Sequence, residues 1–274
     1  MRPIDRLFQN LPQLPTIPAI VQELIQSLGK DDIDLSDLIE KVRQDQSLSA
    51  RVLRLANSPY YGGRKSVGGI DDAVAMIGLN ALRSIVIASG VTGAISKVEG
   101  IDLIRFWKHS QITAQMARSL GRLAGVNPEY AYAAGLLHRI GQLLINLGYP
   151  EIGKQIAKEC RNLSVGELAG LERLHLSFNH AEVSAELARQ WHFPTDICEA
   201  LQHYTQPEPS TRAAYAGVVN LAASMAFGIE QDMPDEVILS RINHGIVRAL
   251  GLEDIDWSVE LVNMRTSIGA AIEL

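Results

Sequence analysis

Apolar residues recur along almost the whole chain with the 3.6-residue period of an amphipathic α-helix, rather than with the alternation of a half-buried strand. The clearest stripe lies between residues 102 and 124, and its members step by four and three residues: His109, Thr113, Met116, Leu120 and Leu123. The Val/Ile-rich run 81–91 has strand propensity, but its helical neighbours favour a buried helix. Apolar stripes are stable when they pack against one another, so the pattern predicts an all-α bundle of roughly ten to thirteen helices.

Capping residues predict several helix boundaries. Asn127 as N-cap, Pro128 at the first helical position and Gly148 as a stop predict one helix over 128–148. Asn179 followed three residues later by Glu182 is a variant of the capping box and predicts a helix that runs to residue 191.

Charge and cysteine usage exclude several classes of protein. Lys and Arg number 25 against 31 Asp and Glu, and the net charge of −6 argues against nucleic acid as a partner. The two cysteines, Cys160 and Cys198, have none of the spacings that bind zinc or build disulfide frameworks. The N-terminus lacks a secretory apolar region, and the longest nearly apolar stretch, residues 84–95, is too short to cross a bilayer. We therefore expect a cytoplasmic protein without a membrane partner.

Four of the seven histidines are predicted to face inward from separate helices, and they are His109, His138, His180 and His203. Imidazole is both a common metal ligand and a general acid–base group. A single inward histidine is more often a hydrogen-bonded core residue than a ligand. Helical bundles nevertheless build metal sites from side chains that project inward from facing helices, so four such residues form a candidate site.

Several motifs, in order, resemble those of the HDOD group, the HD-related output domains of bacterial signalling proteins, within the HD phosphohydrolase superfamily. They are Leu14-Pro15, the run 53–58 with Tyr61-Gly62, the run 106–110, His138-Arg139-Ile140-Gly141, and Asn179-His180-Ala181-Glu182 before Trp191 and Pro194. The resemblance spans residues 14–207. It implies an HD-like helical bundle, which we divide into an N-terminal helical subdomain, 1–98, and an HD-like core with C-terminal helices, 99–274.

The resemblance also implies a metal site, because active HD enzymes hold metal with one early histidine, a His-Asp pair and a distant Asp. His109 and His138 match the two histidine positions, while His180 and His203 fall where two-metal members place additional histidines. This chain departs from the pattern twice. Arg139 replaces the signature Asp, and Ala223 stands where the last Asp is expected.

These departures predict that no cofactor is held and that no catalytic residue remains. A guanidinium stays protonated, so it repels a metal ion at the place where a carboxylate would attract it. We therefore expect a catalytically inactive signal-transduction output module, a pseudoenzyme, that binds a signalling partner protein or a regulatory ligand. The alternative is a metal-dependent HD-type phosphohydrolase acting on a nucleotide or cyclic dinucleotide, which would need a divalent transition metal.

Arg139 allows two interpretations. In the first, its side chain turns to solvent or pairs with a nearby carboxylate while its stem covers apolar surface. In the second, Arg139 forms an anion or ligand pocket with His109, His138, His180 and His203, suited to a phosphate, a nucleotide or a cyclic dinucleotide.

A second candidate surface is the turn 57–63, in which Asn57, Ser58, Tyr60 and Tyr61 offer polar and aromatic side chains. It is either a simple helix-ending turn or a contact for a partner protein.

Overall fold

The computed structural model describes residues 2–28, 35–57, 67–160, 163–208 and 214–272, and within them the chain forms helices and no strand. The all-α prediction is therefore confirmed. The helices are α1 (Pro3–Asn10), α2 (Ala19–Gln26), α3 (Leu35–Gln44), α4 (Gln46–Ala56), α5 (Ile70–Ile77), α6 (Leu79–Ala94), α7 (Leu103–Leu123), α8 (Pro128–Leu137), α9 (Ile140–Gly148), α10 (Pro150–Glu159), α11 (Val165–Leu176), α12 (His180–Gln190), α13 (Thr195–His203), α14 (Ala214–Glu230), α15 (Asp235–Ser240), α16 (His244–Ala249) and α17 (Trp257–Ile272).

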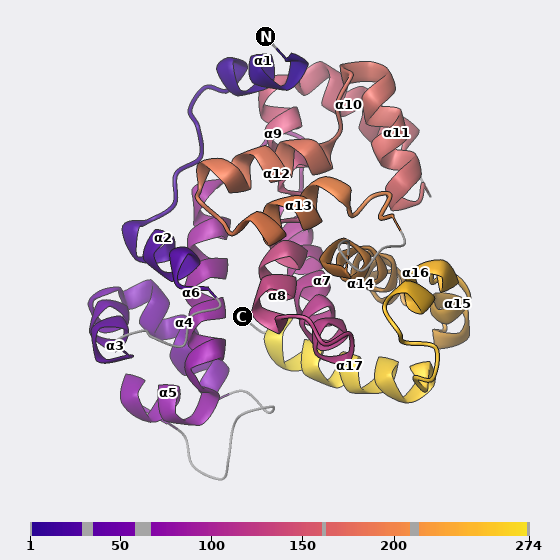
Figure 1. Ribbon diagram of the computed structural model, residues 1–274. Coiled ribbons are helices and arrows are strands. Elements are labelled where there is room, and N and C mark those ends of the chain that lie inside the picture. The colour runs from indigo at the N-terminus through magenta and orange to yellow at the C-terminus, as the bar shows by residue number, and fades with distance from the viewer. Residues whose placement is uncertain (1, 29–34, 58–66, 161–162, 209–213, 273–274) are drawn as a thin grey trace.

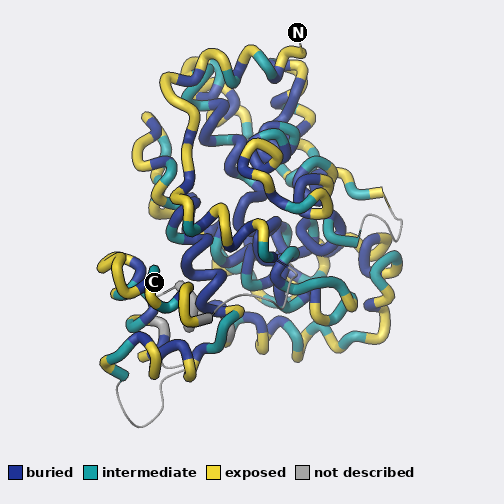
Figure 2. The backbone as a smooth tube through the Cα atoms, turned by 60° about the vertical axis from the view of Figure 1, so that its left-hand side comes forward, coloured by how far each residue is buried: buried dark blue, intermediate teal, exposed yellow. Residues whose placement is uncertain are grey.

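The helices pack around two apolar cores that share α7 (Figure 1). The larger core runs from Ile4 to Ala223, and α7 contributes Phe106 to it. The smaller core joins α7 and α8 to the C-terminal helices α14–α17, with Met116 of α7 at its centre. Figure 2 shows the most deeply buried backbone running through the middle of the molecule, where α7 and α8 lie. The larger core is continuous across residue 98, and the division into subdomains there stays a prediction.

The first helix packs far from the helices that follow it in sequence. α1 lies against α9, where a Cβ on Gly148 would come within 2.4 Å of the Leu7 side chain. The segment after α1 is tied to α12, because Trp191 Nε1 donates a hydrogen bond to the carbonyl oxygen of Pro15 at 3.0 Å. The N-terminal segment thus spans the molecule from α9 to α2, as Figure 1 shows.

The Val/Ile-rich run forms the buried helix α6, as predicted, and a bend of 110° separates it from α5. Gly78 makes this bend with a φ of 83°, a left-handed value that favours glycine. Among the described residues, no single helix is both long and apolar enough to cross a membrane. α5 and α6 meet that criterion only when the two bent helices are counted together.

The predicted single helix over 128–148 is wrong, because the structure divides it into α8 and α9. Asn127 caps α8 as predicted and accepts hydrogen bonds from the backbone of Glu129 and Tyr130. At the junction, His138 Nδ1 bonds the Gly135 carbonyl at 2.6 Å, and the Gly141 backbone N–H donates to Ser184 Oγ at 2.9 Å. These side-chain hydrogen bonds replace regular helical ones, so the helix breaks at His138-Arg139.

Candidate functional site

Three of the four predicted histidines lie in one buried cluster, which we call the histidine cluster: His109, His138, His180 and Tyr204. The ring centroids of His109 and His138 are 5.5 Å apart. Tyr204 contacts both His138 and His180, and its ring centroid is 5.5 Å from that of His138 and 5.8 Å from that of His180. Each histidine comes from a different helix or helix junction, as predicted.

His203 does not join this cluster, so its predicted inward position is wrong. It is the last residue of α13 and its side chain is exposed, whereas the next residue, Tyr204, is 1% exposed. The reason is helical geometry: Tyr204 follows the buried Ala200 by four residues and therefore shares its face.

Two glycines allow the helices that carry the histidines to approach closely. A Cβ on Gly135 would lie 2.8 Å from Cα of Ala114 in α7, so this glycine lets α8 reach the helix of His109. A Cβ on Gly141 would lie 2.1 Å from the carbonyl oxygen of His180, so only glycine fits between α9 and α12. Ser184 links the same two elements, since its hydroxyl donates to the His138 carbonyl at 3.2 Å.

Each histidine of the cluster has an acceptor at its Nδ1 atom. His109 bonds Glu230 Oε2 at 2.9 Å, His138 bonds the Gly135 carbonyl, and His180 bonds Glu172 Oε2 at 2.5 Å. Carbonyl and carboxylate oxygens only accept hydrogen bonds, so each Nδ1 carries the proton and donates. In the neutral rings, Nε2 is then the atom with the free lone pair.

The three Nε2 atoms differ in what they contact. His180 Nε2 accepts from the Tyr204 hydroxyl at 2.5 Å. Burial holds the pKa of Tyr204 well above its ordinary value, so this residue remains a phenol that can donate. No described residue hydrogen-bonds to Nε2 of His109 or His138. The cluster therefore presents two unused imidazole acceptors.

Electrostatics keep these two imidazoles neutral. The pKa of His109 is lowered from 6.5 to about 4, chiefly by burial and next by the nearby Arg139 guanidinium, while hydrogen bonding to Glu230 opposes both. Burial also lowers the pKa of His138, and the interactions with His109 and Arg139 act in the same direction. The hydrogen bond from His109 lowers the pKa of Glu230 to about 2, assisted by Arg105, which donates to Glu230 at 2.8 Å. At neutral pH the site thus holds neutral imidazoles beside an ionised carboxylate.

Arg139 lies beside the cluster and is partly exposed as a residue. Its guanidinium carbon lies 4.8 Å from the centroid of the Phe106 ring, and Nε donates to Gln142 at 3.2 Å. Burial lowers the pKa of Arg139, as expected for a cation removed from water. No carboxylate among the described residues lies within ion-pair distance of it. The carboxylate pair of the first interpretation is therefore not present among the described residues, and the choice between solvent and a ligand for this side chain stays a prediction.

Ala223 is buried in the larger core, so no carboxylate stands at that position. The carboxylate that reaches His109 belongs to Glu230, seven residues further along the same helix and therefore on nearly the same face. Sequence reasoning missed Glu230, Glu172 and Tyr204. The spacing from Ala223 could have pointed to Glu230 and the spacing from Ala200 to Tyr204, but no comparable signal marks Glu172.

The residues present do not fit the metal that HD enzymes use. Within the described part of the chain, no three His, Cys, Asp or Glu side chains gather as a metal-binding group. The two free Nε2 atoms share their surroundings with the cationic Arg139, which repels a divalent ion. The Glu230 carboxylate is already occupied by His109 and Arg105.

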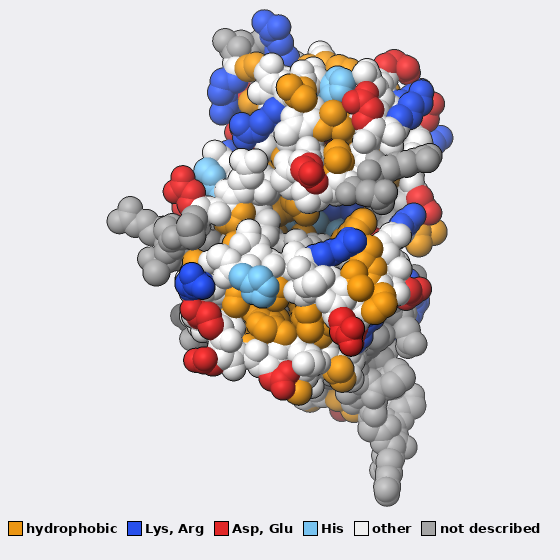
Figure 3. All heavy atoms as spheres, turned by 90° about the vertical axis from the view of Figure 1, so that its right-hand side faces the viewer, with side chains coloured by type: hydrophobic (Ala, Val, Ile, Leu, Met, Phe, Trp, Pro, Cys, Tyr) orange, Lys and Arg blue, Asp and Glu red, His pale blue; other side chains and the backbone are white. Residues whose placement is uncertain are grey.

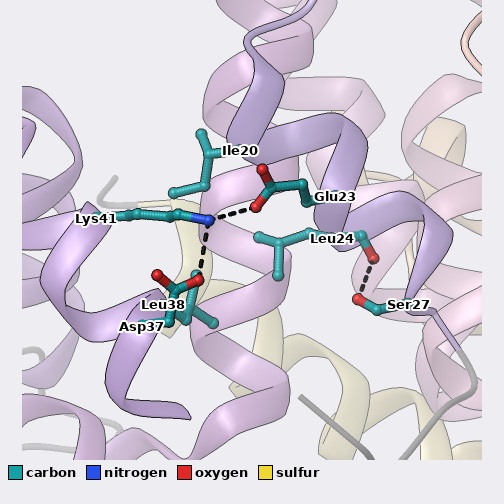
Figure 4. A pocket seen from close by; sticks show the side chains of 7 residues that line it. All are labelled: Ile20, Glu23, Leu24, Ser27, Asp37, Leu38 and Lys41. Carbon is teal, nitrogen blue, oxygen red and sulfur yellow. Dashed lines mark hydrogen bonds and ion pairs between the residues drawn. The ribbon is translucent and has the colours of Figure 1, made fainter. Parts of the chain in front are cut away.

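The surface of the molecule offers two other features. Figure 3 shows the side on which α11, α15 and α16 lie, hollowed between its upper and lower parts, with His and Lys or Arg side chains at the bottom. A separate cavity of about 130 Å³ lies between α2 and α3 (Figure 4). There Lys41 forms ion pairs with Glu23 at 2.5 Å and with Asp37 at 2.9 Å, so the charged side chains that line the cavity already pair with one another.

The candidate partner turn is only partly described. Asn57 is exposed, and its side-chain amide bonds Val67 through both its oxygen and its nitrogen, which joins the two ends of the segment. Ser58, Tyr60 and Tyr61 lie outside the described residues.

Comparison with known proteins places this architecture in a family. The model of the HDOD domain family matches residues 14–207, so the chain belongs to the HDOD domain family. A structure of a proposed phosphohydrolase from Shewanella amazonensis SB2B shares 32% identity, covers 98% of this chain and 96% of its own, and superposes with a TM-score of 0.79. An HDOD domain protein from Geobacter sulfurreducens, 25% identical, covers 99% and 96% with a TM-score of 0.82.

Two further similarities concern longer proteins. A proposed signal transduction protein from Marinobacter aquaeolei VT8 shares the fold, with a TM-score of 0.79 at 20% identity, over 99% of this chain and 64% of its own. The chain is also 25% identical over 201 residues to a curated protein of Treponema pallidum, and spans 39% of the length of that relative.

Proposed function

We propose that this chain is a signal-transduction output module without metal-dependent hydrolase activity, and that it acts by binding a signalling partner protein or a regulatory ligand. The observation that carries the proposal is Arg139, a guanidinium without a carboxylate partner beside the two histidines that HD enzymes use for metal. Metal-assisted hydrolysis needs an ion that activates water and neutralises developing charge. The permanent positive charge of Arg139 beside these histidines opposes binding of such an ion.

The proposal is tested by the metal content of the purified protein and of two variants. We expect trace metal in the wild-type chain. Arg139→Asp restores the signature carboxylate and is expected to raise affinity for Mn²⁺ only in part, because Ala223 still supplies no ligand. Arg139→Met is the matched control, since it removes the cation without adding a ligand. One or two equivalents of Mn, Fe or Ni in the wild-type protein would overturn the proposal.

A second candidate function, metal-dependent hydrolysis of a phosphodiester or nucleotide, has one observation in its favour. His109 and His138 donate from Nδ1 to a carboxylate and a carbonyl, the arrangement that orients metal-ligating histidines in many sites. Hydrolysis of a cyclic dinucleotide that depends on added Mn²⁺ and disappears in His138→Gln would favour this function over the first.

We further propose that the chain works in the cytoplasm. Both cysteines are free thiols, Cys160 partly buried and Cys198 buried, which suits a reducing compartment.

A further inference from the structure

Arg139 carries a positive charge without an ion-pair partner among the described residues, and the Glu230 carboxylate acts on it only from beyond ion-pair distance. Its contacts are an aromatic face, Phe106, and one neutral amide oxygen, that of Gln142. A guanidinium has five N–H donors in a planar fork, and Nε uses one of them here. Removing an unpaired charge from water is costly, so the remaining donors favour an anion that can accept hydrogen bonds from them.

The neighbouring histidines add a second requirement. His109 and His138 are neutral, and their Nδ1 protons are already engaged, so their Nε2 atoms can only accept hydrogen bonds. A ligand that lies against Arg139 and these two rings must accept from the guanidinium and donate to an imidazole. An anion without an O–H can accept hydrogen bonds from the guanidinium. It cannot donate one to an imidazole, so Nε2 stays unpaired.

We propose that Arg139, with the Nε2 atoms of His109 and His138, forms a site for a phosphate group that keeps an O–H at neutral pH, as inorganic phosphate does. Oxygen acceptors of the phosphate bond the guanidinium, and its O–H donates to imidazole. This inference rests on the proposed function and names the chemistry of its ligand.

The test compares phosphate with sulfate, because the two are tetrahedral oxyanions of similar size. At neutral pH phosphate keeps at least one O–H and sulfate keeps none. Titration calorimetry on chelator-treated protein, at matched ionic strength, is expected to give phosphate an affinity at least about tenfold higher than that of sulfate. Chelation removes any ion that could bind phosphate by itself, so the result does not depend on metal.

Three variants separate the parts of the site. Arg139→Gln is expected to abolish binding of both anions, whereas Arg248→Gln, which removes an exposed arginine of α16, should leave both affinities unchanged. His138→Phe is expected to weaken phosphate binding toward the level of sulfate while sulfate binding changes little. Circular dichroism and thermal unfolding of each variant verify that it folds.

Equal affinities for the two anions would contradict the donor requirement, and binding that survives Arg139→Gln would contradict the site. Absence of phosphate binding in a metal-free wild-type chain would overturn this inference and leave the proposed function intact. Bound metal in the purified protein would overturn the proposed function instead.

Discussion

Two arginines of this molecule, the buried Arg118 and the partly exposed Arg139, have opposite surroundings. Arg118 of α7 pairs with Glu129 at 2.8 Å, donates to Ser84 of α6, and lies 4.1 Å over the ring of Tyr132. Arg139 has an aromatic ring as well, but an amide where Arg118 has a carboxylate. The first charge is neutralised within the fold and joins α6, α7 and α8. The second has no ion-pair partner among the described residues, and in our proposal this is the difference between a structural arginine and one that recognises a ligand.

The largest expected effect breaks the paired arginine. Arg118→Met leaves Glu129 buried without its cation, and we expect the free energy of unfolding to fall by about 3–5 kcal/mol. Urea unfolding followed by circular dichroism measures it. The double variant Arg118→Met/Glu129→Leu removes both charges and should recover most of the loss. A single variant as stable as the wild type would show that Glu129 does not depend on Arg118.

The next effect is the pH response of the Arg139 site. The lowered pKa of His109, about 4 against 6.5, means that the unfolded chain takes up a proton before the folded one as pH falls. Stability is therefore lost below pH 6.5, and His109 alone should account for about 2 kcal/mol between pH 6.5 and 4.5. Unfolding curves across that range measure the loss. His109→Gln should reduce the slope, and an unchanged slope would contradict the buried neutral imidazole.

A smaller effect concerns the approach of α9 to α12 that brings His138 and His180 together. Gly141→Ala places a methyl group against the His180 carbonyl, and we expect a loss of about 1–3 kcal/mol. Gly170→Ala is the matched control, because a Cβ there meets nothing within 4 Å and the position is helical and exposed. That change should stabilise the protein by about 0.5–1 kcal/mol. Equal thermal midpoints for the two variants would refute the close approach.

The smallest expected effect is on the unpaired arginine itself. Arg139→Met removes a cation that has no carboxylate partner, so stability should change by less than about 1 kcal/mol, in contrast to Arg118→Met. The same change should raise the pKa of His109, because Arg139 contributes to its depression. NMR titration of the imidazole measures this shift. A large loss of stability in Arg139→Met would place Arg139 in the structural class with Arg118.

Much of the fold could be predicted from sequence, because apolar period and capping chemistry are local signals. Asn179 with Glu182 marks the start of α12, and both reciprocal hydrogen bonds of the capping box are present. The break between α8 and α9 could not be predicted in this way. It depends on Ser184, which lies 43 residues after Gly141 in the chain and takes the hydrogen bond of the Gly141 backbone.

The site shows the same limit. His109, His138 and His180 could be found because each lies on an apolar face or beside a motif. Glu172, 2% exposed, could not, because a glutamate on a helix is ordinarily solvated. Its burial follows from His180, which bonds it through both the backbone N–H and Nδ1. Hydrogen-bond partners such as Glu172 depend on how the helices pack against one another.

The hydrogen bond from Trp191 to Pro15 has a consequence for synthesis of the chain. The segment around Pro15 is synthesised well before its partner, which lies 176 residues later. At about 5–20 residues per second, the segment waits on the order of 10–35 s before Trp191 exists. The apolar face of α1, with Leu7 fully buried in the finished protein, has to wait likewise for Gly148. The segment around Pro15 and the apolar face of α1 are thus made before their partners and reach their final places late.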